Sequence, residues 1–231
     1  MQVRVAGKNG FDDIRSLAIA ISGDSSRRHV GILFRPDEQP VQLIHLGWHG
    51  LLEREPPSND YCWVSVKDIH PVVLDNIADW LPQVWRENGR AIPYSIKPFD
   101  VDPFDENGKL RATLPGEGFT CATFVLWVFH HFKVGLIDAG TWQDRPDDRQ
   151  WRAWIVEMLE RTKIKYQIPD DHIEAQTPYV RHAARFRPEE VAGAAANYQG
   201  EGAAFRNAVD YGIKILDGMK QLGRLPDPVD S

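Results

Sequence analysis

The sequence predicts an α+β fold in which an antiparallel sheet packs on a buried helix and further helices follow toward the C-terminus. Two neighbouring segments, His29–Phe34 and Val41–Leu46, show strand-like alternation and are separated by a turn-rich linker. Residues 120–132 are apolar nearly all round, which indicates a helix buried within the fold. An amphipathic pattern from Trp151 and Ala-rich helical patterns over roughly 188–197 and 202–221 complete the chain.

The elements before the buried helix follow from periodicity in the same way. Residues 1–6 alternate as a short strand does, and apolar residues at helical spacing predict a helix over Phe11–Ser22. After the two strands, a loop is predicted over Glu53–Asp60, and Tyr61–Val66 has the composition of a third strand.

A helical stripe runs from Val73 to Trp85, where Pro82 is expected to kink or shorten the helix. Residues 88–119 hold no periodic pattern, and a loop of this length in a compact domain is often functional. The change of composition past Gly135 divides the chain into an α+β unit, 1–138, and a helical extension, 139–231.

Composition limits the classes of protein to consider. The 231 residues are 42% hydrophobic and 26% charged, as in a globular protein, and the net charge of −6 argues against a general nucleic-acid binder. The longest apolar run, Phe124–Phe129, is too short for an integral membrane segment. The N-terminus lacks the pattern of a signal peptide, so we expect a cytoplasmic protein or one exported without a classical signal peptide.

Two cysteines, Cys62 and Cys121, are too few for a disulfide framework. Cys62 lies in a predicted strand and is interpreted as a core residue. Cys121 opens the buried helix with Thr120 as a candidate cap, where the helix dipole would lower the pKa of the thiol and make it a nucleophile. The alternative is that Cys121 is one more small apolar residue of a core helix, the commoner role of a free cysteine.

A thiolate nucleophile needs a base and a group that orients the base. Alternation places His29 and His45 on strands whose faces can coincide, so the two imidazoles can touch if the strands pair. One would then act as the base and the other as the orienting group. Each could instead be a solvent-facing or hydrogen-bonded histidine.

These motifs resemble a known family. The segments Arg28-His-Val-Gly-Ile-Leu-Phe34 and Gln42-Leu-Ile-His-Leu46, followed by Gly89 to Ile96 and Phe119-Thr-Cys-Ala-Thr-Phe-Val125, are similar to those of circularly permuted papain-like thiol hydrolases. That group includes permuted NlpC-type peptidases and lecithin:retinol acyltransferase-like proteins. The resemblance covers about residues 1–135, but Thr120 stands where the pattern has Asn or Tyr, and no Glu follows two residues after the cysteine.

The resemblance implies a permuted papain-like (NlpC-like) fold with Cys121 as nucleophile, His29 as base and His45 as the third polar residue. The predicted function is a cysteine-dependent hydrolase or acyltransferase that forms an acyl-enzyme with a peptide, amide or acyl-ester substrate. Tyr94 and Thr120 are the candidate substrate-binding residues.

No cofactor or metal is expected. The pairs His45 with His49 and His130 with His131 lack the spacing of a structural zinc site. The acidic loop from Asp100 to Gly108 lacks the glutamate that a calcium-binding hand requires, so we interpret it as solvated surface.

Two other functions remain open at this point. The fold could have lost activity and serve as a binding module, with the C-terminal helices contacting a protein partner. It could also be an exported effector or toxin that cleaves amide bonds outside its cell.

Overall fold

The computed structural model describes residues 1–7, 10–24, 26–36, 39–111 and 113–226, and it confirms the α+β class. Its sheet is antiparallel, with strand order β4-β3-β2-β1-β5. The strands are β1 (Leu17–Gly23), β2 (Arg28–Phe34), β3 (Gln42–Trp48), β4 (Leu51–Glu55) and β5 (Cys62–Ser65). The predicted hairpin is therefore present as β2 and β3, although residues 37–38 of its linker lie outside the described part.

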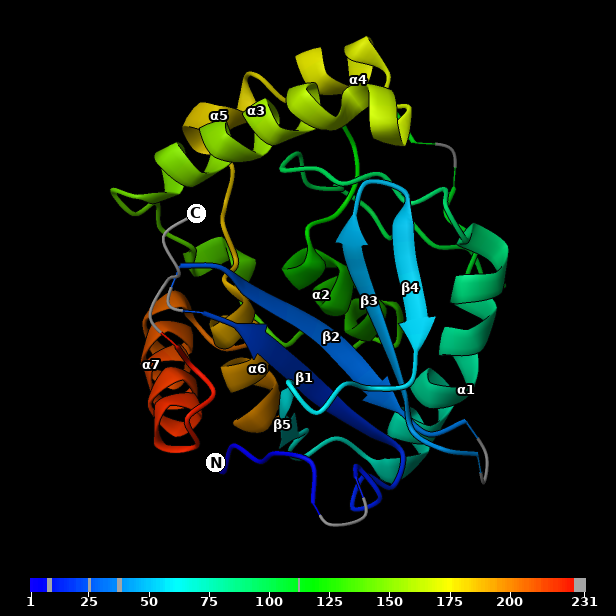
Figure 1. Cartoon of the computed structure of the whole chain (residues 1–231), viewed down its shortest axis with the longest axis vertical. Coiled ribbons are helices and arrows are strands. Elements are labelled where there is room, and N and C mark those ends of the chain that lie inside the picture. The colour runs from blue at the N-terminus through cyan, green and yellow to red at the C-terminus, as the bar shows by residue number, and fades with distance from the viewer. Residues whose placement is uncertain (8–9, 25, 37–38, 112, 227–231) are drawn as a thin grey trace.

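One face of the sheet is covered by helices. The helices are α1 (Pro71–Asn88), α2 (Cys121–His131), α3 (Asp148–Tyr166), α4 (Asp170–Glu174), α5 (Tyr179–His182), α6 (Pro188–Ala196) and α7 (Phe205–Gln221), with a 3-10 turn at Ala139–Thr141. Helices α1, α2 and α6 pack on the strands, and α7 packs on α6 (Figure 1). Helices α3 to α5 lie across one end of the sheet, beyond β3 and β4 (Figure 1). Within the described residues, no helix combines the length and apolarity needed to cross a bilayer.

The predicted helix over Phe11–Ser22 is wrong, because its second half forms β1. Residues 17–21 are apolar at every position, so the same residues fit a helical and a strand period. In the structure the side chains alternate between two hydrophobic clusters: Ile19 enters the main core, and Ala18 and Ala20 enter a smaller cluster with Phe11 on the opposite face. A continuous apolar run is the pattern of a strand that is buried on both faces.

Two further predictions for strands need correction. Residues 51–55 form β4, so the loop predicted to begin at Glu53 starts later in the chain. The charged side chains of Glu53, Arg54 and Glu55 fit the position of β4 at the edge of the sheet, where charges discourage pairing with another chain. At the N-terminus, residues 1–6 form only an isolated bridge between Arg4 and Trp63 instead of a strand.

Helix α1 continues past Pro82 to Asn88, so the proline does not shorten it. Between α1 and α2 the described residues contain no named helix or strand, only isolated bridges, which confirms the long loop predicted over 88–119 apart from residue 112 outside the described part. The two Ala-rich patterns correspond to α6 and α7. Helix α6 contributes Val191 and Ala192 to the main core under the sheet.

Candidate active site

Cys121 lies at the first position of α2, and a capping box fixes the start of that helix. The Thr120 hydroxyl accepts a hydrogen bond from the Thr123 backbone N–H at 3.1 Å, and the Thr123 hydroxyl accepts one from the Thr120 N–H at 2.7 Å. The predicted cap at Thr120 is therefore confirmed. Because the cap satisfies N–H groups that would otherwise have no intrahelical partner, it holds the thiol at a defined place, where Cys121 is 7% exposed.

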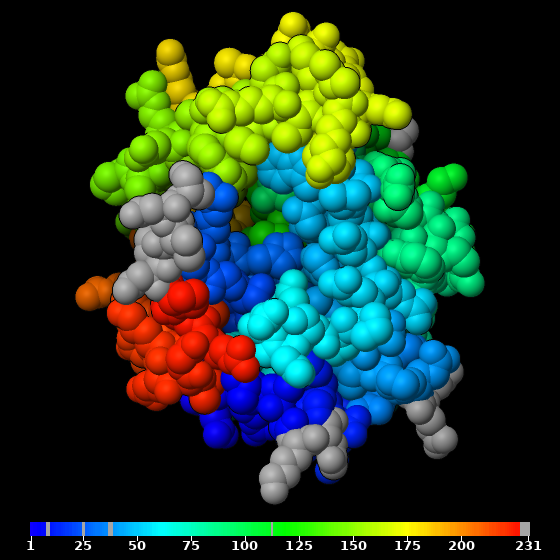
Figure 2. Space-filling view, viewed as in Figure 1, coloured from blue at the N-terminus to red at the C-terminus, as the bar shows by residue number. Residues whose placement is uncertain are grey.

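Cys121 and His29 line the same cavity, which has a volume of about 630 Å³. Backbone pairing of β2 with β3 runs from Phe34 opposite Gln42 to Ile32 opposite Ile44, and α2 lies behind the point where these strands diverge (Figure 1). Figure 2 shows the surface hollowed between α3 and the strands, with green atoms from the region of α2 deep inside. Tyr94 and Thr120 also line this cavity, so the sequence-predicted residues other than His45 meet there.

The imidazoles of His29 and His45 are hydrogen-bonded across the diverging strands. His29 Nε2 and His45 Nδ1 are 2.9 Å apart, and the rings meet edge to face at 80°. Gly31 makes this contact possible, because a Cβ atom there would lie 2.9 Å from the Cβ of His45. The predicted pairing of the two histidines is therefore present.

A carboxylate extends this pair, and it fixes a consistent set of proton positions. His45 Nε2 lies 3.3 Å from Glu55 Oε1 and 3.8 Å from Glu53 Oε2. Because a carboxylate only accepts, His45 Nε2 carries a proton, and in a neutral His45 ring Nδ1 is then the acceptor for His29 Nε2–H. This assignment leaves His29 Nδ1 unprotonated, which is the state that a general base requires.

The sequence does not single out Glu53 and Glu55, because residues 53–60 have the composition of a loop. Glu53 and Glu55 are two residues apart and follow the apolar pair Leu51 and Leu52, which is a weak signal of a strand. In a strand this spacing puts both carboxylates on one side of β4, the side that faces His45. Pairing of β4 with β3 sets His45 opposite Glu53 and Leu43 opposite Glu55.

Burial raises the pKa of the Cys121 thiol to about 11, the opposite of the direction predicted from the helix terminus. Backbone N–H groups of Val30, Ala122 and Cys121 itself act to lower this pKa, and the nearby charge of Glu189 raises it. A buried thiolate loses its hydration, and this raises the pKa of Cys121 by more than the N–H groups at the helix N-terminus lower it. At neutral pH the resting thiol is protonated.

Burial also lowers the pKa of His29 to about 3, and repulsion from His45 acts in the same direction. The imidazole is therefore neutral at all physiological pH values. The Cys121 thiol and the His29 imidazole, which line the same cavity, are therefore both uncharged at rest and do not form a thiolate–imidazolium pair.

Tyr94 is held on several sides. The Cys121 backbone N–H interacts with its phenolic oxygen, while burial raises the pKa of Tyr94 well above its ordinary value. Its own backbone N–H donates to His49 Nδ1 at 3.3 Å, and its carbonyl accepts from His172 Nε2 at 3.0 Å. His172 comes from α4, a contribution of the C-terminal residues that the sequence did not reveal.

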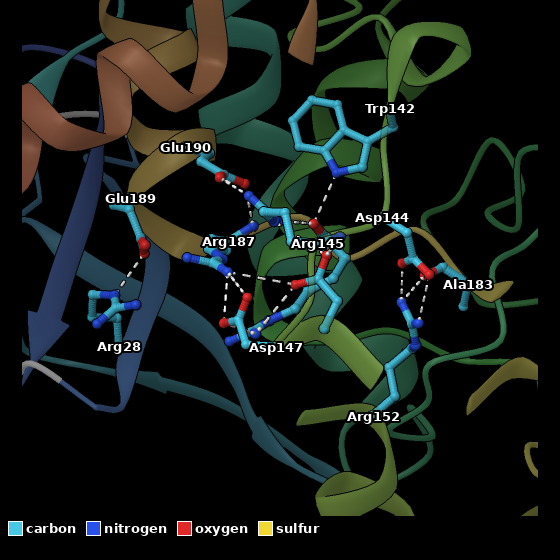
Figure 3. A network of polar contacts seen from close by, with 12 residues as sticks. Arg28, Trp142, Asp144, Arg145, Asp147, Arg152, Ala183, Arg187, Glu189 and Glu190 are labelled. Atoms are coloured by element: carbon cyan, nitrogen blue, oxygen red, sulfur yellow. Dashed lines mark hydrogen bonds and ion pairs between the residues drawn. The ribbon is translucent and has the colours of Figure 1, made fainter. Parts of the chain in front are cut away.

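The C-terminal segments are tied to the rim of the cavity by a network of ion pairs (Figure 3). Arg28 on β2 donates to Glu189 on α6 at 2.8 Å, directly beside His29. Arg187 Nη2 binds Asp147 at 2.7 Å, and Arg145 binds Glu190. These pairs lock the start of α6 against β2 and against the segment that precedes α3.

Three of the four histidines considered for metal binding have hydrogen-bond partners. His45 and His49 bond as described above, and His131 Nδ1 lies 2.9 Å from Asp102 Oδ2. In the described ranges of the chain, no group of three or more histidine, cysteine or acidic side chains has the arrangement of a metal site. Cys62 is fully buried in the main core.

No family model, curated protein or solved structure gives a match to this chain.

Proposed function

We propose that the protein is a cysteine-dependent hydrolase or acyltransferase in which Cys121 is the nucleophile, His29 the base and His45 the residue that orients the base. The observation that carries this proposal is that a capped, helix-opening cysteine shares a cavity with an imidazole held by a second imidazole. A nucleophile, a base and an orienting group in this relation are the parts that covalent acyl transfer needs.

The chemistry begins when a carbonyl group enters the cavity beside Cys121. His29 Nδ1 takes the thiol proton as the sulfur attacks the carbonyl carbon, and the Nε2–H bond to His45 stabilises the imidazolium that forms. Backbone N–H groups of Val30 and Ala122, which stabilise negative charge on the sulfur, assist the same step. His29 then returns the proton to the leaving group, and water or an acceptor releases the acyl group from the thioester.

A permuted papain-like architecture is part of the same proposal. The two histidine strands precede the cysteine helix along the chain, and they form an antiparallel sheet against which that helix packs. This order and packing agree with the resemblance seen in the sequence.

Hydrolysis of p-nitrophenyl acetate tests the proposal without knowledge of the natural substrate. We expect turnover that falls at least about 10³-fold in Cys121→Ala and in His29→Gln. Cys62→Ala is the matched control, because Cys62 lies in the core away from both cavities, and it should retain turnover. Equal turnover in all variants, or loss only in Cys62→Ala, would contradict the assignment.

The protonated resting thiol is the one observation that favours the binding-module alternative. A binding module would show no ester turnover at any pH and would keep its ligand when Cys121 is replaced by alanine. An enzyme of the proposed kind gains activity as its substrate displaces water from the site.

A further inference from the structure

The long loop between α1 and α2 passes beside Cys121, and its residues 93–96 form a wall of the site. Tyr94 lines the cavity that contains Cys121, whereas Ser95 and Ile96 line a second, adjoining cavity of about 370 Å³. The main chain of residues 93–96 is hydrogen-bonded along both of its edges. The partners on these two edges therefore determine where this wall of the site stands.

One edge of the segment bonds to the residues that lead into α2. The Ser95 N–H donates to the Phe119 carbonyl at 3.0 Å, and the Phe119 N–H donates to the Pro93 carbonyl at 3.0 Å. The two chains are in close contact, because a Cβ atom on Gly118 would collide with the Pro93 carbonyl oxygen. Since Phe119 is two residues before Cys121, the segment and the start of α2 are joined directly.

The other edge bonds to side chains of the C-terminal part. His172 Nε2–H on α4 donates to the Tyr94 carbonyl at 3.0 Å, and the side-chain carbonyl of Gln176 accepts from the Ile96 N–H at 3.0 Å. Gln176 follows α4, is fully buried, and donates to the His172 carbonyl at 3.3 Å. His172 and Gln176, which we call the α4 clamp, thus satisfy buried backbone groups that a neighbouring strand would otherwise pair.

A histidine from the turn between β3 and β4 completes this edge. His49 Nδ1 accepts the Tyr94 N–H at 3.3 Å, and α4 lies beyond that turn (Figure 1). The rings of His49 and His172 meet edge to face, with their centroids 4.9 Å apart. Burial lowers the pKa of His49 to about 4 and also lowers the pKa of His172, so both rings are neutral at pH 7 and keep these donor and acceptor roles.

Tyr94 connects the clamp to the candidate nucleophile. Its phenolic oxygen interacts with the Cys121 backbone N–H, and its ring packs against that of Trp48 with 4.5 Å between the centroids. Cys121 is buried, and this burial is the main cause of its raised pKa. A retreat of Tyr94 would move the wall of the cavity and admit water to the sulfur.

We propose that the α4 clamp positions Tyr94 against the start of α2, so that the C-terminal part of the chain completes the active site. His172 and Gln176 are positioning residues, because neither is among the described residues that line the cavity and both act through the main chain of the loop. The inference rests on the proposed function, in which Cys121 is the nucleophile. It goes beyond that function by giving residues 139–231 a part in the site.

Alkylation of the whole chain by iodoacetamide tests the clamp independently of turnover. His172→Ala removes the donor to the Tyr94 carbonyl, so we expect water to reach Cys121 and its alkylation at pH 8 to accelerate about tenfold. His172→Gln keeps an N–H donor at this place and should restore the slow alkylation. His182→Ala, which removes an exposed histidine of α5, is the matched control and should leave the rate unchanged.

Cys62 provides an internal control for general loosening of the fold. It is fully buried in the main core, so release of the clamp alone should leave its alkylation unchanged in the same samples. Turnover of p-nitrophenyl acetate should fall at least about tenfold in His172→Ala, because misplacement of a group in the site by about 1 Å can cost ~10²-fold in rate. His172→Gln should recover this turnover.

The outcomes separate the two proposals. Selective acceleration at Cys121 in His172→Ala, in a protein without ester turnover, would overturn the proposed function and leave the clamp standing. Unchanged alkylation of Cys121, equal acceleration at Cys62, ester turnover that His172→Ala does not reduce, or failure of His172→Gln to restore slow alkylation would overturn the clamp.

Discussion

Gly31 lies on β2 where that strand faces β3, and replacing it with alanine perturbs the histidine pair without touching either ring. A Cβ atom at this position would lie 2.9 Å from the Cβ of His45, the carbonyl oxygen of Ile44 and the Cδ1 of Leu43. Ordinary contact for a Cβ atom begins at 3.4 Å, so the neighbours must retreat by 0.5 Å or more. Two of the three atoms belong to, or are bonded directly to, the backbone of β3. The strand itself therefore has to move.

The size of the effect follows from this geometry. Overpacking of this kind costs about 1–3 kcal/mol. For a chain of this length each kcal/mol lowers the melting temperature by about 2–4 °C, so the Tm of Gly31→Ala should fall by roughly 2–12 °C. Displacement of His45 also lengthens its 2.9 Å bond to His29, and misplacement of a catalytic group by about 1 Å can cost ~10²-fold in rate.

Thermal unfolding followed by circular dichroism and hydrolysis of p-nitrophenyl acetate at a temperature well below the transition measure the two effects. Gly7→Ala is the matched control, since its Cβ atom would meet only the Gly10 carbonyl oxygen, at 3.7 Å, and Gly7 lines neither cavity. A Gly31→Ala protein with the Tm and the turnover of the control would contradict the predicted displacement of β3.

Three further predictions concern charge. First, stability should fall as the pH drops below about 6.5, because His29 stays neutral in the folded protein, with a pKa of about 3, but takes up a proton when unfolded. The unfolding constant should rise by up to about tenfold per pH unit in denaturant titrations, and His29→Gln should flatten this slope; an unchanged slope would contradict the buried neutral imidazole. Second, Glu55→Gln should lower turnover by less than about tenfold because its carboxylate is half exposed, whereas His45→Ala should cost about 10²-fold or more; equal losses would show that the carboxylate matters as much as the imidazole. Third, Arg152→Met should destabilise the protein by about 1–3 kcal/mol, because it removes the buried guanidinium that donates to the carbonyls of Val180 and Ala183, while Asp144 is half exposed and can be hydrated; an unchanged urea midpoint would rule this out.

The parts of the fold that the sequence predicted well are those with one dominant local signal. Alternation around His29 and His45 predicted the hairpin, and Thr120 before an apolar run predicted the cap of α2. The helix expected over Phe11–Ser22 failed because residues 17–21 are apolar throughout, and only burial on both faces of the sheet selects the strand. That burial depends on residues distant in the chain.

In the candidate site too, the features set by local sequence were predicted, and those set by tertiary contacts were not. To predict that Cys121 and His29 line the same cavity, the sequence had to supply only the order of the elements and the pairing of β2 with β3. Glu55 and His172 could not be anticipated, because each reaches the site through an edge strand or a helix whose docking is set by tertiary contacts. The pKa of the thiol was predicted in the wrong direction, since helix position is readable from the sequence and desolvation is not.

Formation of a thioester on Cys121 is the central claim, and intact-protein mass spectrometry tests it most directly. The protein is mixed with excess p-nitrophenyl octanoate, quenched in acid within seconds, and its modified peptide is mapped. We predict a single added octanoyl group on Cys121 that is absent in His29→Gln and lost on incubation at neutral pH. Acylation of Cys62, of lysines only, or of Cys121 at the same rate in His29→Gln would contradict the assigned nucleophile and base.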